Sequence, residues 1–176
     1  MSFEKAFAHV IGVEGGYVDN PNDKGGATKF GITQKVLEAW RKKPVTKDDV
    51  KNLQLEEAKK IYKKNYWDTM SLDSVRSQTL QHMLFDQGVN SGVGTAAKAL
   101  QQILGVTQDG KIGPKTIDAI NAKHPFELCS RFIQVRQLFY VRLCKQDPSQ
   151  MVFLEGWINR THKLIDLLDE AVKETV

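Results

Sequence analysis

The chain has 176 residues, 41% of them hydrophobic, and carries a formal net charge of +4 with a pI near 9.0. This length and composition suffice for a buried core and exclude a disordered or low-complexity chain. The apolar runs are far shorter than the roughly 18 residues of a membrane span, and Glu4 and Lys5 stand where a signal peptide would be apolar. We therefore expect a protein with no membrane span and no Sec signal of its own, synthesised in the cytoplasm.

The cysteine and histidine content indicates neither a disulfide nor a metal centre. Cys129 and Cys144 are fifteen positions apart in one helical pattern. That spacing separates them by about 22 Å at 1.5 Å per residue, which is too far for a disulfide. The four histidines show no metal-ligand spacing. We expect free thiols in a reducing compartment, no metal and no cofactor.

The positive charge permits binding to anionic polymers such as nucleic acid, anionic lipid or bacterial cell wall. The basic residues are dispersed, with short clusters only at 41–43 and 59–64, and no nucleic-acid-binding motif accompanies them. Nucleic acid is therefore not an expected partner.

The first predicted element is a helix over residues 2–13, followed by Gly15-Gly16 as its stop signal. Glu14 would lie on the last turn of this helix. There, burial and the negative end of the helix dipole both favour the protonated carboxyl that a general acid needs. The alternative is a solvated residue at a helix end. The helix itself is predicted because apolar residues recur on one of its faces, namely Phe3, Phe7, Val10 and Ile11.

Residues 14–33 form a glycine-rich segment with three acidic residues, Glu14, Asp19 and Asp23. A helix interior does not tolerate this density of glycine, so we predict a loop or a short β-hairpin. Glycoside hydrolysis needs two carboxyl functions, one to protonate the leaving oxygen and one to activate water or stabilise the oxocarbenium-like centre. A helix end followed by such a hairpin can bring Glu14 and Asp23 to opposite sides of one groove.

Two phrases of this segment, Glu-Gly-Gly-Tyr from Glu14 and Asn-Asp-Lys-Gly-Gly-Ala-Thr-Lys-Phe-Gly-Ile-Thr up to Thr33, resemble the signature of glycoside hydrolase family 108, the phage-type N-acetylmuramidases. The resemblance implies that Glu14 is the catalytic acid, and it makes Tyr17 a candidate for binding the sugar. Eight residues separate Glu14 from Asp23, as in the lysozymes of T-even phages. Four residues separate Asp23 from Thr28 and nine separate it from Thr33, so either threonine is a candidate to hold the attacking water.

Short helices are predicted next, over residues 34–41, 46–49 and 55–66, with Thr33 and Thr46 as the N-caps of the first two. An aromatic pair, Tyr66-Trp67, ends the third and again resembles the muramidase family. Trp67 is a candidate to stack on a sugar ring. The favoured alternative is a core aromatic at a helix terminus.

A further helix is predicted over residues 73–90, and it ends in Asn90-Ser-Gly. In the family this tail lies at the edge of the groove, which implies that the Asn90 amide hydrogen-bonds an N-acetyl group of the substrate. An equally weighted alternative is a helix C-cap, in which Asn and Gly serve the left-handed position.

Residues 95–120 contain the pattern Leu-Gln-x-x-Leu-Gly followed by Asp-Gly-x-x-Gly-Pro-x-Thr. The pattern is similar to peptidoglycan-binding modules and implies the glycan strands of peptidoglycan as a partner. It predicts a helix, a tight turn at Asp109-Gly110 and a second helix with Pro114 in its first turn. Structural needs alone also explain each of these residues.

Two long helices are predicted at the end of the chain. The first, over residues 125–145, is apolar all round and belongs in the centre of the fold. A buried Arg136 on it could pair with a carboxylate of the groove. The second, over residues 151–174, begins with the Gly-Trp-x-Asn-Arg of the family. We expect Trp157 to be packed and Arg160 to be paired, while Asn159 either serves helix packing or contacts sugar.

These observations predict a mainly α protein, and the resemblance implies a lysozyme-like helical fold with a small β-hairpin near the active site. It further implies a catalytic part over residues 1–92 and a peptidoglycan-binding part over 93–176, packed into one globular monomer. The implied function is hydrolysis of the β-1,4 bond between N-acetylmuramic acid and N-acetylglucosamine. The implied setting is a phage or prophage endolysin that acts on the wall, in the periplasm, after its release from the cytoplasm.

Two other functions remain open. A lytic transglycosylase would need Glu14 but not Asp23, because the 6-hydroxyl of the sugar itself attacks. A non-catalytic wall-binding protein, an accessory to secretion or assembly, would survive the loss of Glu14.

Overall fold

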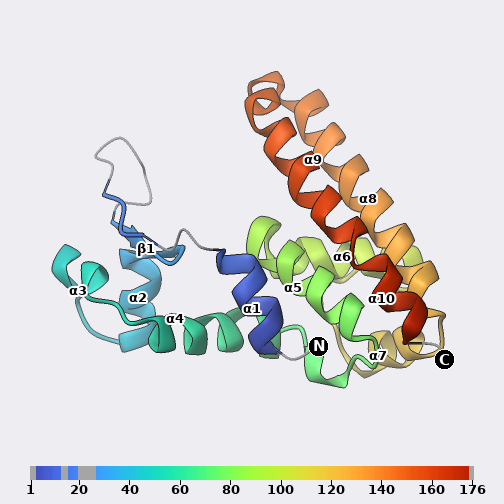
Figure 1. The fold of residues 1–176 in the computed structure, drawn as a ribbon, viewed down its shortest axis with the longest axis horizontal. Helices are drawn as coiled ribbons and strands as arrows, with labels where there is room; N and C mark the ends of the chain where they lie inside the picture. The colour runs from blue at the N-terminus through green and yellow to red at the C-terminus, as the bar shows by residue number, and fades with distance from the viewer. Residues whose placement is uncertain (1–2, 13–15, 20–26, 175–176) are drawn as a thin grey trace. The chain divides into compact units, whose positions relative to one another are not determined.

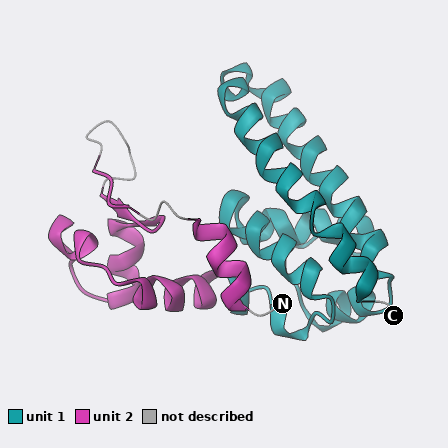
Figure 2. Cartoon of the chain, in the orientation of Figure 1, with its two compact units in different colours: residues 1–2, 66–176 teal, residues 3–65 magenta. Residues whose placement is uncertain are grey.

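The computed structural model describes residues 3–12, 16–19 and 27–174 of the chain. The chain forms two compact units, Phe3–Asn65 and Tyr66–Val176 (Figure 2). Among the helices in these ranges, none combines the length and the apolar character that crossing a membrane requires.

The first unit begins with α1, Phe3–Ile11, whose buried face carries Phe3, Ala6 and Phe7. The helix is shorter than predicted and does not reach Glu14. It ends because Gly12 adopts φ +63, where its N–H donates to the carbonyl of Ala8 at 3.2 Å. A glycine in this left-handed conformation is a common helix stop.

A two-residue turn connects β1, Thr28–Lys29, to β2, Ile32–Thr33, in an antiparallel hairpin. Phe30 and Gly31, the turn residues, have φ +51 and +73, as a type I′ turn requires. From α4, the Tyr62 hydroxyl donates to the carbonyl of Phe30 at 3.0 Å. The predicted hairpin is therefore present, and a buried tyrosine holds its strained turn.

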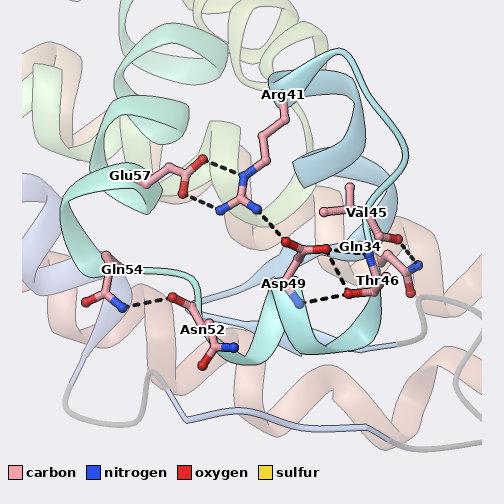
Figure 3. A network of polar contacts seen from close by, with 8 residues as sticks. All are labelled: Gln34, Arg41, Val45, Thr46, Asp49, Asn52, Gln54 and Glu57. Atoms are coloured by element: carbon pink, nitrogen blue, oxygen red, sulfur yellow. Dashed lines mark hydrogen bonds and ion pairs between the residues drawn. The ribbon is translucent and has the colours of Figure 1, made fainter.

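The remaining helices of this unit are α2, Gln34–Arg41, α3, Lys47–Lys51, and α4, Leu55–Tyr62. Arg41 joins all three, because its guanidinium donates to both carboxylate oxygens of Glu57 at 2.9 and 2.7 Å and to Asp49 at 3.1 Å (Figure 3). The hydrogen bonds from Arg41 lower the pKa of Glu57, and those from Thr46 lower the pKa of Asp49. The predicted capping box of Thr46 and Asp49 is confirmed.

A π-helical segment, Lys63–Asp68, follows α4, so the helix predicted over residues 55–66 is α-helical only in its first part. The second unit then contains a 3₁₀ turn, Leu72–Ser74, and a further 3₁₀ turn at Pro148–Gln150. Its α-helices (Figure 1) are α5, Gln78–Ser91; α6, Val93–Leu104; α7, Pro114–Asn121; α8, Pro125–Gln146; α9, Met151–Ile165; and α10, Leu168–Lys173.

The centre of this unit is α5, in which every residue from Thr79 to Gly88 is buried. It packs against α6, α8 and α10. Its N-terminus is capped by Ser77, and the Glu174 carboxylate accepts hydrogen bonds from Ser77, from Thr79 Oγ1 and from the Thr79 backbone N–H. A carboxylate is favourable there because the helix dipole is positive at that end.

The turn between α6 and α7 is held by Gln101, a buried residue of α6. Its amide nitrogen donates to Asp109 at 2.7 Å and to the carbonyl of Lys111 at 2.9 Å, and its oxygen accepts from the Gly110 N–H at 3.0 Å. The predicted turn at Asp109-Gly110 and the start of α7 at Pro114 are both confirmed.

Side by side, α8 and α9 form a long helical pair (Figure 1). Both cysteines lie on α8 as buried free thiols, as predicted, and burial raises the pKa of Cys129 to about 12. The single helix predicted over residues 151–174 is interrupted, since α9 ends at Ile165 and α10 starts at Leu168. The mainly α, lysozyme-like fold with a small hairpin is confirmed.

Candidate active site

The two predicted catalytic carboxyl groups, Glu14 and Asp23, lie outside the described residues. What the structure describes is the framework on either side of Asp23, from Gly16 to Asp19 and from Ala27 onward. This framework holds the two ends of the segment that contains Asp23.

The segment that contains Asp23 is anchored at both of its ends. Val18 and Thr28 exchange two backbone hydrogen bonds of 2.8 Å as an antiparallel bridge. The next residue, Asp19, forms an ion pair of 3.0 Å with Lys47 of α3. The bridge therefore fixes the two ends of the segment, Val18 and Thr28, next to each other.

Thr28 and Thr33, the two candidate threonines, are directly opposite each other in the hairpin. Cross-strand partners place their side chains on the same face of an antiparallel pair, and the neighbouring Ile32, on the other face, is buried. Thr33 is also the N-cap of α2, where its hydroxyl oxygen accepts from the Val36 N–H at 3.3 Å. The hairpin thus brings both threonines together, and the choice between them as holder of the water stays open.

Tyr17, the candidate sugar contact, is half-buried and directly precedes Val18 of the bridge. Tyr17 is therefore the neighbour of the residue that pairs with Thr28 of the hairpin. Its part in binding substrate stays a prediction.

Trp67 is a core residue in this structure, with 1% of its surface exposed. Its indole nitrogen donates to Asp73 at 2.7 Å, and its ring meets that of Phe85 edge-on at 5.6 Å. The geometry matches the favoured alternative, a core aromatic at a helix terminus, and leaves the ring no open face for stacking on a sugar.

Asn90 lies within α5 rather than at its cap, because the left-handed position at the helix end belongs to Gly92 with φ +90. Its side-chain oxygen accepts from the Tyr140 hydroxyl at 2.6 Å and from Ser91 at 3.1 Å. With this oxygen occupied, a role in substrate binding would fall to its amide NH₂ group.

Asp86 is a buried acid that the sequence analysis did not single out. It is 2% exposed, one turn before Asn90, and binds both Arg136 of α8 and Arg160 of α9. Burial raises the pKa of Asp86, but the charges and hydrogen bonds of Arg136 and Arg160 outweigh it and hold the pKa below its ordinary value. An aspartate directly after the apolar residues Met83, Leu84 and Phe85 of the predicted helix was the available signal.

The Gly-Trp-x-Asn-Arg sequence on α9, residues 156–160, contains both packed and exposed residues. Trp157 stacks on Tyr140 with ring centroids 4.9 Å apart, and Arg160 pairs with Asp86 at 2.8 Å, so both predictions are confirmed. Asn159 is exposed on the same helix, and its contact with sugar stays a prediction. No group of three or more His, Cys, Asp or Glu in the described ranges is arranged to hold a metal ion.

Comparison with known proteins places these features in a family. Residues 7–92 match the family model described as Glycosyl hydrolase 108, and residues 95–162 match a Predicted Peptidoglycan domain. The structure of SagA from Brucella abortus matches with a TM-score of 0.80 and 35% identity, over 97% of this chain and 94% of that one. A search of curated proteins gave no match. The protein is a peptidoglycan-active glycoside hydrolase with a peptidoglycan-binding region. It belongs to the glycosyl hydrolase 108 family.

Proposed function

We propose that the protein is an N-acetylmuramidase that hydrolyses the β-1,4 bond between N-acetylmuramic acid and N-acetylglucosamine. The observation that carries the proposal is the extent of the hydrolase match. Its range, residues 7–92, includes the whole acidic segment from Glu14 to Thr33. Within that segment the described hairpin holds two hydroxyl groups on one face, directly after the residues that contain Asp23.

In this mechanism Glu14 protonates the glycosidic oxygen as the bond to the leaving sugar breaks. Asp23, with Thr28 or Thr33, positions the attacking water or stabilises the positive charge that develops on the sugar. What supports Asp23 in this role is its place between Val18 and Thr28, whose backbone bridge fixes both ends of the segment that contains it.

The decisive experiment is digestion of purified peptidoglycan by the intact protein and by Glu14→Gln, with mass spectrometry of the products. Loss of the general acid should reduce the rate by about 10²- to 10⁴-fold. A matched control is Glu38→Gln, which removes an exposed carboxylate from α2 of the same unit and should leave the rate unchanged. Reducing N-acetylmuramic acid ends that require Glu14 would support the proposal.

The other outcomes would assign the protein elsewhere. Anhydro-muramic ends, with Asp23→Asn still active, would indicate a lytic transglycosylase. Reducing N-acetylglucosamine ends would indicate cleavage of the other glycosidic bond. Wall that is bound but uncut, with binding retained in Glu14→Gln, would indicate a non-catalytic accessory protein.

We further propose that the protein acts as a monomeric phage or prophage endolysin, made in the cytoplasm and active on the wall in the periplasm after release. The support is the resemblance of residues 14–33 to phage-type muramidases. Expression in a Gram-negative host with and without a co-expressed holin tests the setting, since lysis should require the holin.

A further inference from the structure

A cavity of about 240 Å³ lies in the unit of residues 66–176, among α5, α6 and α8. Its walls follow helical spacing, with α6 contributing Lys98, Ala99 and Gln102 and α8 contributing Arg136 and Arg142. The helix arrangement is visible in Figure 1. Of the predicted catalytic and sugar-binding residues that the structure describes, none lines it.

The lining of this cavity is basic. Lys98, Arg136 and Arg142 are among the ten described residues that form its wall, and none of the ten is acidic. The other polar lining residues, such as Gln87 and Gln102, offer neutral amide groups. Charges of one sign in a hollow with low-dielectric walls raise the local concentration of ions of the opposite sign, so the cavity favours an anion.

The Arg136 guanidinium is held in place by two partners, but one of its nitrogens has none among the described residues. Only 1% of this residue is exposed, and its guanidinium is held on two sides, since Nη1 donates to Asp86 and Nε donates to the Tyr140 hydroxyl at 2.9 Å. The third nitrogen, Nη2, is buried and makes no hydrogen bond to any residue that the structure describes. Buried donors without a partner are rare in folded proteins. A guanidinium N–H held in this way suits a carboxylate oxygen, to which it donates a charge-assisted hydrogen bond.

Asp86 does not cancel this positive charge, because it is shared. Its carboxylate binds Arg136 and Arg160 together, so the three groups carry a net charge of +1. Lys98 and Arg142 add to that charge at the exposed side of the cavity.

We propose that this cavity binds a carboxylate of a peptidoglycan stem peptide, with Arg136 Nη2 as the central donor and Lys98 and Arg142 at the rim. The inference rests on peptidoglycan as the substrate of this protein. Stem peptides combine free carboxylates with amide groups, and the cavity combines cationic groups with the side-chain amides of Gln87 and Gln102. The site would make binding depend on the peptide as well as on the glycan strand.

The test is isothermal titration calorimetry of the intact protein with free stem peptide released from peptidoglycan by an amidase. The double variant Lys98→Gln/Arg142→Gln removes two rim charges from exposed positions and should weaken binding by about tenfold or more. The matched control is Lys145→Gln, which removes an exposed charge from α8 outside the cavity and should bind as the wild type does. A second variant, Ala99→Phe, fills the cavity without changing any charge and should also weaken binding.

Two further probes identify the ligand group. Stem peptide with methyl-esterified carboxylates should not bind, and inorganic phosphate should bind less tightly than the free peptide. Absence of peptide binding, equal binding of the esterified peptide, unchanged affinity in both cavity variants, or tighter binding of phosphate would each overturn the proposal. Hydrolysis of whole wall, measured in parallel on the wild type, separates these outcomes from failure of the muramidase proposal.

Discussion

The buried aspartate of α5 provides a sharp test of how the second unit is held together. Asp86 is the acidic member of a cluster in which the Arg136 side chain is fully buried and the Arg160 side chain is partly exposed. Replacement of Asp86 by Asn keeps the size of the side chain and removes its charge. Arg136 would then remain buried with no compensating charge.

The expected loss of folding free energy in Asp86→Asn is a large fraction of the stability of a typical domain. Removing one partner of a buried ion pair costs about 3–5 kcal/mol, and we expect the lower end because the Asn oxygen still accepts one hydrogen bond. A domain of this size loses about 2–4 °C of melting temperature per kcal/mol, so Asp86→Asn should melt roughly 6–12 °C below the wild type. The control Asp118→Asn changes an exposed residue of α7 and should stay within about 0.5 kcal/mol of the wild type.

The assay is urea unfolding followed by circular dichroism, completed by a double-mutant cycle with Arg136→Met. Replacing both members of a buried pair with neutral groups of similar volume is often nearly neutral. Arg136→Met in the Asp86→Asn background should therefore cost much less than in the wild type. Additive losses, or a cost below about 1 kcal/mol for Asp86→Asn, would refute the view that this pair is electrostatically coupled.

The pH dependence has a definite sign. Because the pKa of Asp86 is lower in the folded state than its ordinary value of 3.8, the unfolded chain binds more protons near that pH. The contribution of Asp86 is therefore complete above about pH 5 and is lost as the pH falls below 3.8 toward the folded pKa. The difference in stability between the wild type and Asp86→Asn should shrink over that range, and a difference that grows on acidification would contradict the assignment.

Two further substitutions test local geometry. Gly31→Ala should destabilise the protein by about 2 kcal/mol or more, because the residue has φ +73 and the new Cβ would lie 2.5 Å from the Tyr62 hydroxyl oxygen; thermal unfolding measures the loss, and Tyr62→Phe should relieve part of it. Gln101→Leu should cost about 1–3 kcal/mol, because it leaves the Gly110 N–H without its acceptor. Unchanged melting temperature in Gln101→Leu would show that the amide is not needed to hold the turn.

The elements that were predictable from the sequence are those with local causes. The capping box of Thr46 and Asp49, the N-cap of Thr33 and the proline start of α7 depend on neighbouring residues only, and each is confirmed. The end of α1 was predicted wrongly, because the helix ends at Ile11, where Gly12 takes the left-handed conformation. A single glycine inside an apolar pattern gives no indication of its φ angle.

The site was less predictable, because its partners are distant in the sequence. Arg136 and Arg160 were expected to be paired, but their common partner, Asp86, is 50 and 74 residues away from them. Helical periodicity places a residue on a face but does not identify the residue opposite. Trp67 shows the same limit, since its position after a helix suited either a groove or the core.

The packing of α5 bears on how the segments of the two family matches are related. By sequence, α5 falls within the hydrolase match, residues 7–92, whereas Arg136 and Arg160 fall within the peptidoglycan match, residues 95–162. By packing, all three belong to the unit of residues 66–176. The predicted division at residue 92 stays a prediction about function, but a physical separation there would remove Asp86 from two arginines and uncover the buried face of α5. The peptidoglycan-binding region therefore depends for its core on α5, a helix of the hydrolase segment.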